Sequence, residues 1–229
     1  MIRLKADLHT HTADDPYDDV RYSSEMLVDA VAQLNVQVLA IACHRKVVEF
    51  PRLTEYARRR DVLLVPAVEL LVEGRHVVAL NPDAEQAAAR TFAQLRALGR
   101  RNAAFVAPHP FYLENSCLGR DLVANIDLFD AIEYCTLYYH GVNPNRRAVK
   151  VARQHGLPMV GTSDIHMWPY VGLTFSWLEV EEKSVEGVIE AIREGRVTVQ
   201  TRPQSFGQNA RMLRSFVHEK LRMMAGLRE

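Results

Sequence analysis

The sequence predicts an α/β protein built on a parallel sheet with crossover helices. Apolar, β-rich segments of strand length alternate with helix-like segments about seven times along the 229 residues. The residues that follow these predicted strands repeatedly include a histidine or a carboxylate, beginning with Asp7-Leu8-His9-Thr10-His11. Because the carboxyl ends of parallel strands meet at one face of a barrel, we expect these side chains to converge.

The first half of the chain begins with a strand in which residues 2–6 alternate between apolar and polar side chains. His9 and His11 are two positions apart, so they point to the same side and can bind one metal ion. Ser23 or Ser24 then caps a helix with a periodic apolar face. The next elements are a strand at 36–42 leading to His44, a helix at 51–60, a strand at 62–68 ending at Glu69, a turn at Gly74 and a strand at 76–80 that begins with His76.

The second half continues the alternation of helices and strands. We expect a helix at 81–98 stopped by Gly99, a strand at 103–107 before His109, an irregular segment at 111–125, a strand at 129–134 holding Glu133, a helix at 145–154, a strand at 158–162 before Asp164 and His166, a helix at 184–194 and a strand at 197–200. Residues 205–229 have apolar side chains at helical spacing and cationic ones on the other side. They predict an amphipathic helix that packs on the barrel or on a second subunit, giving a homo-oligomer.

Composition limits the classes of protein to consider. Hydrophobic residues make up 48% of the chain and charged residues 24%, and no linker interrupts it, so we expect one globular domain over residues 1–229. The formal net charge of zero does not indicate a nucleic-acid partner, although it leaves a local groove possible. Apolar runs are too short to span a bilayer, and three cysteines form no disulfide framework. We therefore expect a reduced, cytoplasmic protein without a membrane partner.

The residue types at the strand ends indicate the class of metal. Imidazole and carboxylate ligands without paired thiolates suit Zn²⁺, Mn²⁺ or Fe²⁺ in a hydrolytic site. Six of the nine histidines belong to this set, together with three carboxylates. These ligands are too many for one ion, so the sequence predicts two or three divalent ions.

The ordered motifs resemble those of the PHP (polymerase and histidinol phosphatase) family of metal-dependent phosphoesterases. The motifs that carry this resemblance are Asp7-Leu8-His9-Thr10-His11-Thr12, Ile41-Ala42-Cys43-His44, Ala67-Val68-Glu69, Arg75-His76-Val77, Ala107-Pro108-His109-Pro110 and Gly161-Thr162-Ser163-Asp164-Ile165-His166. They span residues 7–166 in order. The resemblance implies a distorted seven-stranded (β/α)7 barrel with a trinuclear metal site.

The resemblance also assigns the ligands. It implies that His9, His11, Glu69 and Asp164 hold a first ion, that Glu69 bridges to a second held by His76 and His109, and that Asp15, His44 and His166 hold a third. Catalytic roles would fall to Asp164, Glu69 and His109. The implied reaction is attack on a small phosphomonoester by a hydroxide that bridges the metals.

Other functions remain open at this stage. A nuclease acting on oligonucleotide ends needs a local basic groove, and a scaffold role would use the metals for stability alone. An amidohydrolase is disfavoured because it usually needs a bridging lysine, and no lysine stands at a mid-chain strand end. Removal and return of metal would separate an enzyme, which regains turnover, from a scaffold, which loses its fold.

Several loop positions have competing roles. Asp14, Asp15 and Asp18 are alternative loop ligands, and Asp15 before Pro16 is preferred. Cys43 stands where many family members have a polar residue, and a small buried residue is its default role. Glu133 is expected to support the site.

Substrate contacts are less defined. Arg45, next to a predicted ligand, and Arg120 are candidates for contact with a substrate phosphate. Trp168 and Tyr170 could line the mouth of the pocket or simply pack.

Overall fold

The computed structural model describes residues 1–48, 51–167 and 171–205. Its strands are β1 (Ile2–Thr10), β2 (Val38–Ile41), β3 (Leu63–Val72), β4 (Arg75–Leu80), β5 (Ala104–Ala107), β6 (Ala131–Cys135), β7 (Met159–Thr162), β8 (Thr174–Val180) and β9 (Val197–Thr201). Its helices are α1 (Ser24–Gln33), α2 (Pro51–Arg58), α3 (Ala84–Ala88), α4 (Phe92–Leu98), α5 (Asp121–Ala124), the 3₁₀ turn η1 (Ile126–Leu128), α6 (Asn145–His155) and α7 (Val185–Arg193). The predicted C-terminal helix at 205–229 lies almost wholly outside the described residues.

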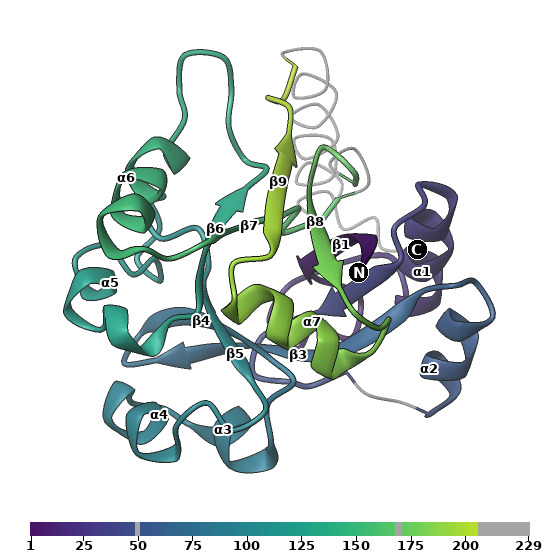
Figure 1. Ribbon diagram of the computed structural model, residues 1–229, viewed down its shortest axis with the longest axis horizontal. Helices are drawn as coiled ribbons and strands as arrows, with labels where there is room; N and C mark the ends of the chain where they lie inside the picture. Colours follow the sequence, from purple (N-terminus) through teal and green to yellow (C-terminus); the bar gives the residue numbers. More distant parts are fainter. Residues whose placement is uncertain (49–50, 168–170, 206–229) are drawn as a thin grey trace, which may run out of the picture.

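The described strands form one sheet in the order β7-β6-β5-β4-β3-β2-β1-β8-β9. β7, at one edge, also lies against β9, β8 and β1 at the other side, so the sheet nearly closes into a barrel. Figure 1 shows α6 and α5 at one side of the strands, α3 and α4 below them and α1 and α2 at the opposite side. The predicted α/β barrel-like architecture is confirmed.

The sheet is mixed, whereas the sequence predicted parallel strands. β1, β2 and β3 pair in parallel, as do β5, β6 and β7, but β4 is antiparallel to both of its neighbours. Only Glu73 and Gly74 separate β3 from β4, and both have positive φ, 51° and 81°. Such a two-residue turn joins antiparallel strands, whereas a parallel pair needs a long crossover.

Two further elements differ from the sequence-based expectation. β8 was not predicted, although residues 173–177 alternate apolar and polar side chains; it pairs antiparallel with β1 and β9. The expected helix at 81–98 is two helices, because Asp83 with Gln86 and Thr91 with Gln94 each form a capping box. A second helix start at Thr91 interrupts the first helix.

The barrel interior is filled by small and branched apolar side chains together with α7. Alternate residues of β1, Leu4, Ala6 and Leu8, belong to the same core cluster as Val188 and Ile192 of α7. The guanidinium of Arg193 donates hydrogen bonds to the carbonyls of Arg101 and Ala103, just before β5 begins. α7 therefore covers the amino end of the strands and leaves their carboxyl end to the candidate site.

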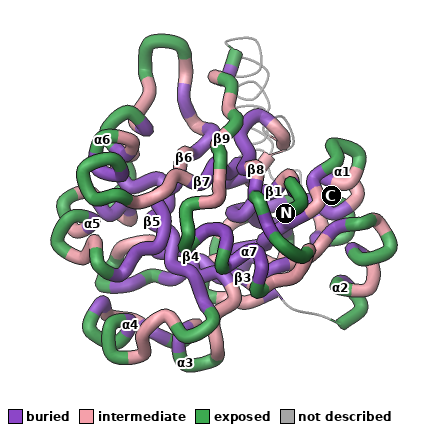
Figure 2. Tube along the Cα trace, in the orientation of Figure 1, coloured by how far each residue is buried: buried purple, intermediate pink, exposed green. Residues whose placement is uncertain are grey.

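Burial follows this arrangement. Buried positions run along the strands, and exposed positions lie on the outer surfaces of the helices, as Figure 2 shows. No helix within the described ranges is long and apolar enough to cross a membrane.

Candidate metal centre

All the histidines and carboxylates predicted as metal ligands meet at the carboxyl end of the barrel. His9 lies in β1 and His11 just after it, His44 follows β2, Glu69 and His76 lie in β3 and β4, His109 follows β5, and Asp164 and His166 follow β7. The register of β1 against β2 shifts between Asp7 and Thr10, at the point where β1 delivers His9. Residues up to 157 positions apart in sequence are thereby brought to one site.

Four ligand atoms surround the first candidate position. His9 Nε2 lies 3.1 Å from His11 Nε2, 3.2 Å from Glu69 Oε2 and 3.6 Å from Asp164 Oδ1. His11 Nε2 lies 3.3 Å from each of the same two oxygens. Ligands about 2.1 Å from a tetrahedral ion are separated by roughly 3.4 Å. The spacing of the His9, His11 and Asp164 atoms therefore fits a divalent cation, and Glu69 Oε2 lies within ligand-to-ligand distance of both imidazoles.

The other oxygen of Glu69 faces a second group. Glu69 Oε1 lies 2.8 Å from His76 Nδ1 and 3.2 Å from His109 Nε2. His76 Nδ1 is buried and makes no hydrogen bond in the structure. Its contact with Glu69 Oε1 therefore lacks hydrogen-bond geometry, and a cation bound between these three atoms would satisfy all of them.

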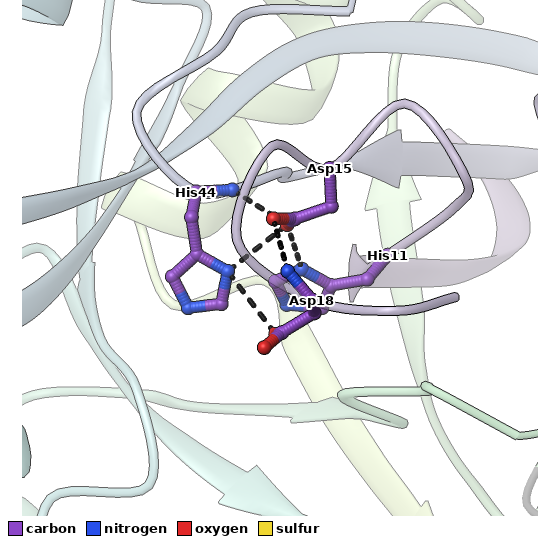
Figure 3. Close-up of side chains that lie close together, drawn as sticks. All are labelled: His11, Asp15, Asp18 and His44. Atoms are coloured by element: carbon purple, nitrogen blue, oxygen red, sulfur yellow. Dashed lines mark hydrogen bonds and ion pairs between the residues drawn. The ribbon is translucent and has the colours of Figure 1, made fainter. Parts of the chain in front are cut away.

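A third group lies around His44, where Figure 3 shows Asp15 and Asp18 directed at the imidazole ring. Asp15 Oδ2 lies 2.9 Å from Nδ1 of both His11 and His44. Asp18 Oδ2 lies 3.4 Å from His44 Nδ1 and 2.9 Å from His166 Nε2. The two acids therefore contact different pairs of histidines.

The three loop acids also differ in how many hydrogen bonds they already accept. Asp15 is buried and accepts the backbone N–H groups of Tyr17, Asp18 and His44. The carboxylate of Asp14 accepts from the Ser24 hydroxyl and lies 3.3 Å from Lys46 Nζ. The Asp18 carboxylate is 39% exposed and has the most free capacity for a ligand.

Glu133 forms hydrogen bonds with two of the candidate ligands, His9 and His109. Its Oε1 lies 2.8 Å from His9 Nδ1 and accepts the Thr162 hydroxyl, and its Oε2 accepts the His109 backbone N–H at 2.6 Å. Its side chain is fully buried. With Nδ1 of His9 engaged by Glu133, Nε2 is the nitrogen that faces the metal position.

His109 has an unusual partner on its other ring nitrogen. Its Nδ1 lies 3.4 Å from the thiol sulfur of buried Cys117. Neither contact was predicted from the sequence: His109 and Cys117 are eight residues apart across an irregular segment, and Glu133 and Thr162 are 29 residues apart. Cys43 is buried 3.8 Å from the Thr12 hydroxyl, belongs to no candidate metal group among the described residues, and burial raises the pKa of its thiol.

Charge balance at the site also fits a cation. Burial lowers the pKa of His9, but the carboxylates of Glu69, Asp164 and Glu133 outweigh burial and raise that pKa to about 10. Burial raises the pKa of Glu69, but the surrounding histidines hold it well below its ordinary value. Protons on the imidazoles thus supply the positive charge that these carboxylates require. A bound metal ion supplies the same charge and displaces the protons.

The backbone is strained beside the ligands. His109 has φ of 28°, Asp164 of 45° and Arg45 of 55°, all in the left-handed region that residues other than glycine rarely adopt. Such conformations persist where the surrounding structure fixes them and they cluster at functional sites.

The two arginines predicted to contact the substrate differ in their position relative to the candidate ligands. Arg45 follows His44 directly, and its guanidinium donates to the Tyr17 hydroxyl at 2.9 Å. Arg120 is exposed and directly precedes α5. Trp168 and Tyr170 lie outside the described residues.

Comparison with known proteins identifies the fold. The PHP-associated family model (PHP_C) matches residues 142–197, a segment that contains Asp164 and His166. A two-domain protein from Bacteroides vulgatus ATCC 8482, described as containing a predicted PHP-like metal-dependent phosphoesterase, superimposes with a TM-score of 0.65 at 17% identity. The chain has a PHP-like fold. That match covers 88% of the chain and 65% of the two-domain protein.

Two other structures share the PHP-like fold. PsfC from Pseudomonas syringae PB-5123 matches with a TM-score of 0.68 and 19% identity over 96% of this chain and 99% of PsfC. The lesion-specific endonuclease PfuEndoQ from Pyrococcus furiosus matches with a TM-score of 0.63 and 14% identity over 86% of this chain and 58% of the endonuclease. Among curated proteins, a sequence comparison finds no significant match.

Proposed function

We propose that this chain is a metal-dependent phosphoesterase that hydrolyses a phosphomonoester, with small phosphomonoesters as the first substrates to test. The observation that supports this most directly is Glu69, whose two oxygens face two different ligand groups. A carboxylate shared in this way can hold two ions close together. When bound, such ions lower the pKa of a water molecule and neutralise charge on phosphoryl oxygens.

Exposure indicates the side from which a substrate enters. The side chains of His9, His11 and Glu69 are at most 1% exposed, whereas His44 is 16% and His166 35% exposed. A phosphate group would therefore approach from the His44 and His166 side. Arg45 is positioned beside this opening to pair with a phosphate oxygen.

We assign the proton transfer of this reaction to Asp164. Its Oδ1 faces His9 and His11, while its Oδ2 lies 3.9 Å from His109 Nε2 and has no closer ion-pair partner among the described residues. Asp164 Oδ2 can therefore orient an attacking water and accept its proton. In this proposal Glu69 and His109 bind the ion at the second candidate position.

The proposed function is tested by removing metal and returning it. We expect elemental analysis of the purified protein to give two or three of Mn, Zn or Fe per chain, and hydrolysis of an aryl phosphate to stop after chelation. Turnover should return with Mn²⁺ or Zn²⁺. Loss of folding without any hydrolysis by the reloaded protein would instead indicate a metal-stabilised scaffold, and metal content below one ion per chain would contradict the site itself.

We further propose that His44 and His166 hold the third ion together with a loop acid, and that Asp18 contributes more to it than its neighbours. Asp18→Asn should lower the metal content by about one ion per chain, because Asp18 reaches both histidines. Asp14→Asn, the matched control, should leave the content unchanged, because Asp14 is held by Ser24 and Lys46. Unchanged content in Asp18→Asn, or equal loss in both variants, would contradict this assignment.

The variant Asp15→Asn tests the remaining alternative, in which Asp15 is the loop ligand. Asp15 contacts His11 as well as His44, so this variant should weaken the first and third positions together. Loss of the third ion alone in Asp15→Asn, with Asp18→Asn unaffected, would make Asp15 the loop ligand that the sequence favoured.

A further inference from the structure

The exposed face of α6 is a strip of positive charge that the candidate metal centre does not use. Arg146, Lys150 and Arg153 recur at intervals of four and three residues, so they lie on one side of the helix. All three are exposed, as is Arg147 beside them. α6 contains no aspartate or glutamate.

This charge is not neutralised by the fold. Within residues 1–48, 51–167 and 171–205, no carboxylate lies at ion-pair distance from Arg146, Lys150 or Arg153. Three aspartates of the preceding segment are already paired: Asp121 with Arg75, Asp127 with Arg96 and Asp130 with Arg100. A local basic surface therefore exists although the net charge of the chain is zero.

The positions of the charges also oppose helix stability. Arg146 and Arg147 lie in the first turn of α6, where the helix dipole is positive and disfavours cations. Asn143 Oδ1 accepts the Asn145 backbone N–H at this end, but no acidic residue in the first turn compensates for the two cations. An anionic partner would remove this repulsion.

The strip begins next to the candidate metal centre. Asn145, the first residue of α6, exchanges two hydrogen bonds with the backbone of Cys135, which ends the strand that carries Glu133. The Arg147 guanidinium lies 4.3 Å from the ring centre of Phe111, two residues after His109. Figure 1 shows α6 running away from this end of β6.

We propose that the exposed face of α6 binds the phosphate backbone of a single-stranded nucleic acid whose end lies at the metal centre. The strip from Arg146 to Arg153 is about 10 Å long, and the rise of a stacked strand is roughly 3.4 Å per nucleotide, so the strip can follow the strand over about three nucleotide steps. The guanidinium of Arg147 covers the half-buried Phe111 ring and places a fourth cation beside the strip. The inference rests on the proposed function, since it names the class of molecule that carries the phosphate ester.

The test compares two triple variants of equal charge change in the metal-loaded protein. One is Arg146→Gln, Lys150→Gln, Arg153→Gln on α6. The control is Arg52→Gln, Arg58→Gln, Arg59→Gln, at two positions of α2 and the residue that follows it, across the molecule from α6 (Figure 1). The probe is a fluorescein-labelled phosphorothioate oligodeoxynucleotide, and its binding is followed by anisotropy at several salt concentrations. Hydrolysis of the aryl phosphate is measured in parallel.

The α6 variant should bind the strand at least about tenfold more weakly and lose roughly two units of the slope of log K against log salt, the effect of three missing phosphate contacts. The α2 control should bind as the unmodified protein does, and both variants should retain aryl phosphate hydrolysis. Equal weakening in both variants, or no binding by the unmodified protein, would overturn the inference. Strand binding through α6 without any hydrolysis would overturn the proposed function alone.

Discussion

Glu69→Gln is expected to remove both ions that share this side chain and to lower aryl phosphate turnover by well over about 100-fold. That factor is the upper range for losing a residue that only supports a ligand, and Glu69 faces two ligand groups directly. Glutamine keeps the size of the side chain but replaces one carboxylate oxygen with an amide that donates hydrogen bonds. Glutamine therefore cannot bind one ion together with His9 and His11 and a second ion together with His76 and His109.

The control for this experiment is Glu179→Gln, which makes the same chemical change at an exposed position of β8, away from the site. Metal content by elemental analysis, steady-state turnover and thermal unfolding are measured on both variants. Glu69→Gln should lose about two ions per chain while Glu179→Gln loses none. Full metal content and normal turnover in Glu69→Gln would contradict the shared-carboxylate site.

Glu133→Gln is expected to weaken metal binding about 10- to 100-fold, the usual effect of removing a partner that orients a ligating histidine. Both Glu133 oxygens accept hydrogen bonds, from His9, Thr162 and the His109 backbone. In Glu133→Gln the amide NH2 replaces one of these acceptor oxygens and faces a hydrogen-bond donor. Leaving these buried groups unpaired costs about 1–3 kcal/mol of folding free energy.

The metal dependence of turnover distinguishes a role of Glu133 in positioning His9 from a role in stability alone. If Glu133 acts by orienting His9, excess Mn²⁺ should restore most of the turnover of Glu133→Gln, because the ligands themselves are intact. The metal titration should show a shifted dissociation constant with a stoichiometry near that of the unmodified protein. An unchanged dissociation constant together with a lower unfolding temperature would show that Glu133 contributes to stability alone.

Convergence of the ligand residues could be predicted from local sequence. Short apolar runs predict strands, and His9, His44, His109 and Asp164 each stand where such a run ends. In a barrel-like sheet those ends meet at one face whatever the details of the connections. Spacing of two residues was sufficient to place His9 and His11 side by side.

Other features depended on contacts between distant segments. The hairpin at Glu73 and Gly74 and the pairing of β8 with β1 make the sheet mixed, and periodicity within a strand does not report the direction of its neighbour. The break of the helix at Thr91 could have been found, since its capping residues are close in sequence.

The sequence by itself determined which residue types gather at the carboxyl end of the barrel, because ligand chemistry and strand periodicity are local properties. Only the tertiary structure separated Asp15 from Asp18 and paired His9 with Glu133. It also showed that Arg146, Lys150 and Arg153 of α6 have no acidic partner in the described part of the chain, although the net charge of the sequence is zero. These depend on distances between atoms tens to more than a hundred residues apart, and such distances are fixed by packing of the complete barrel.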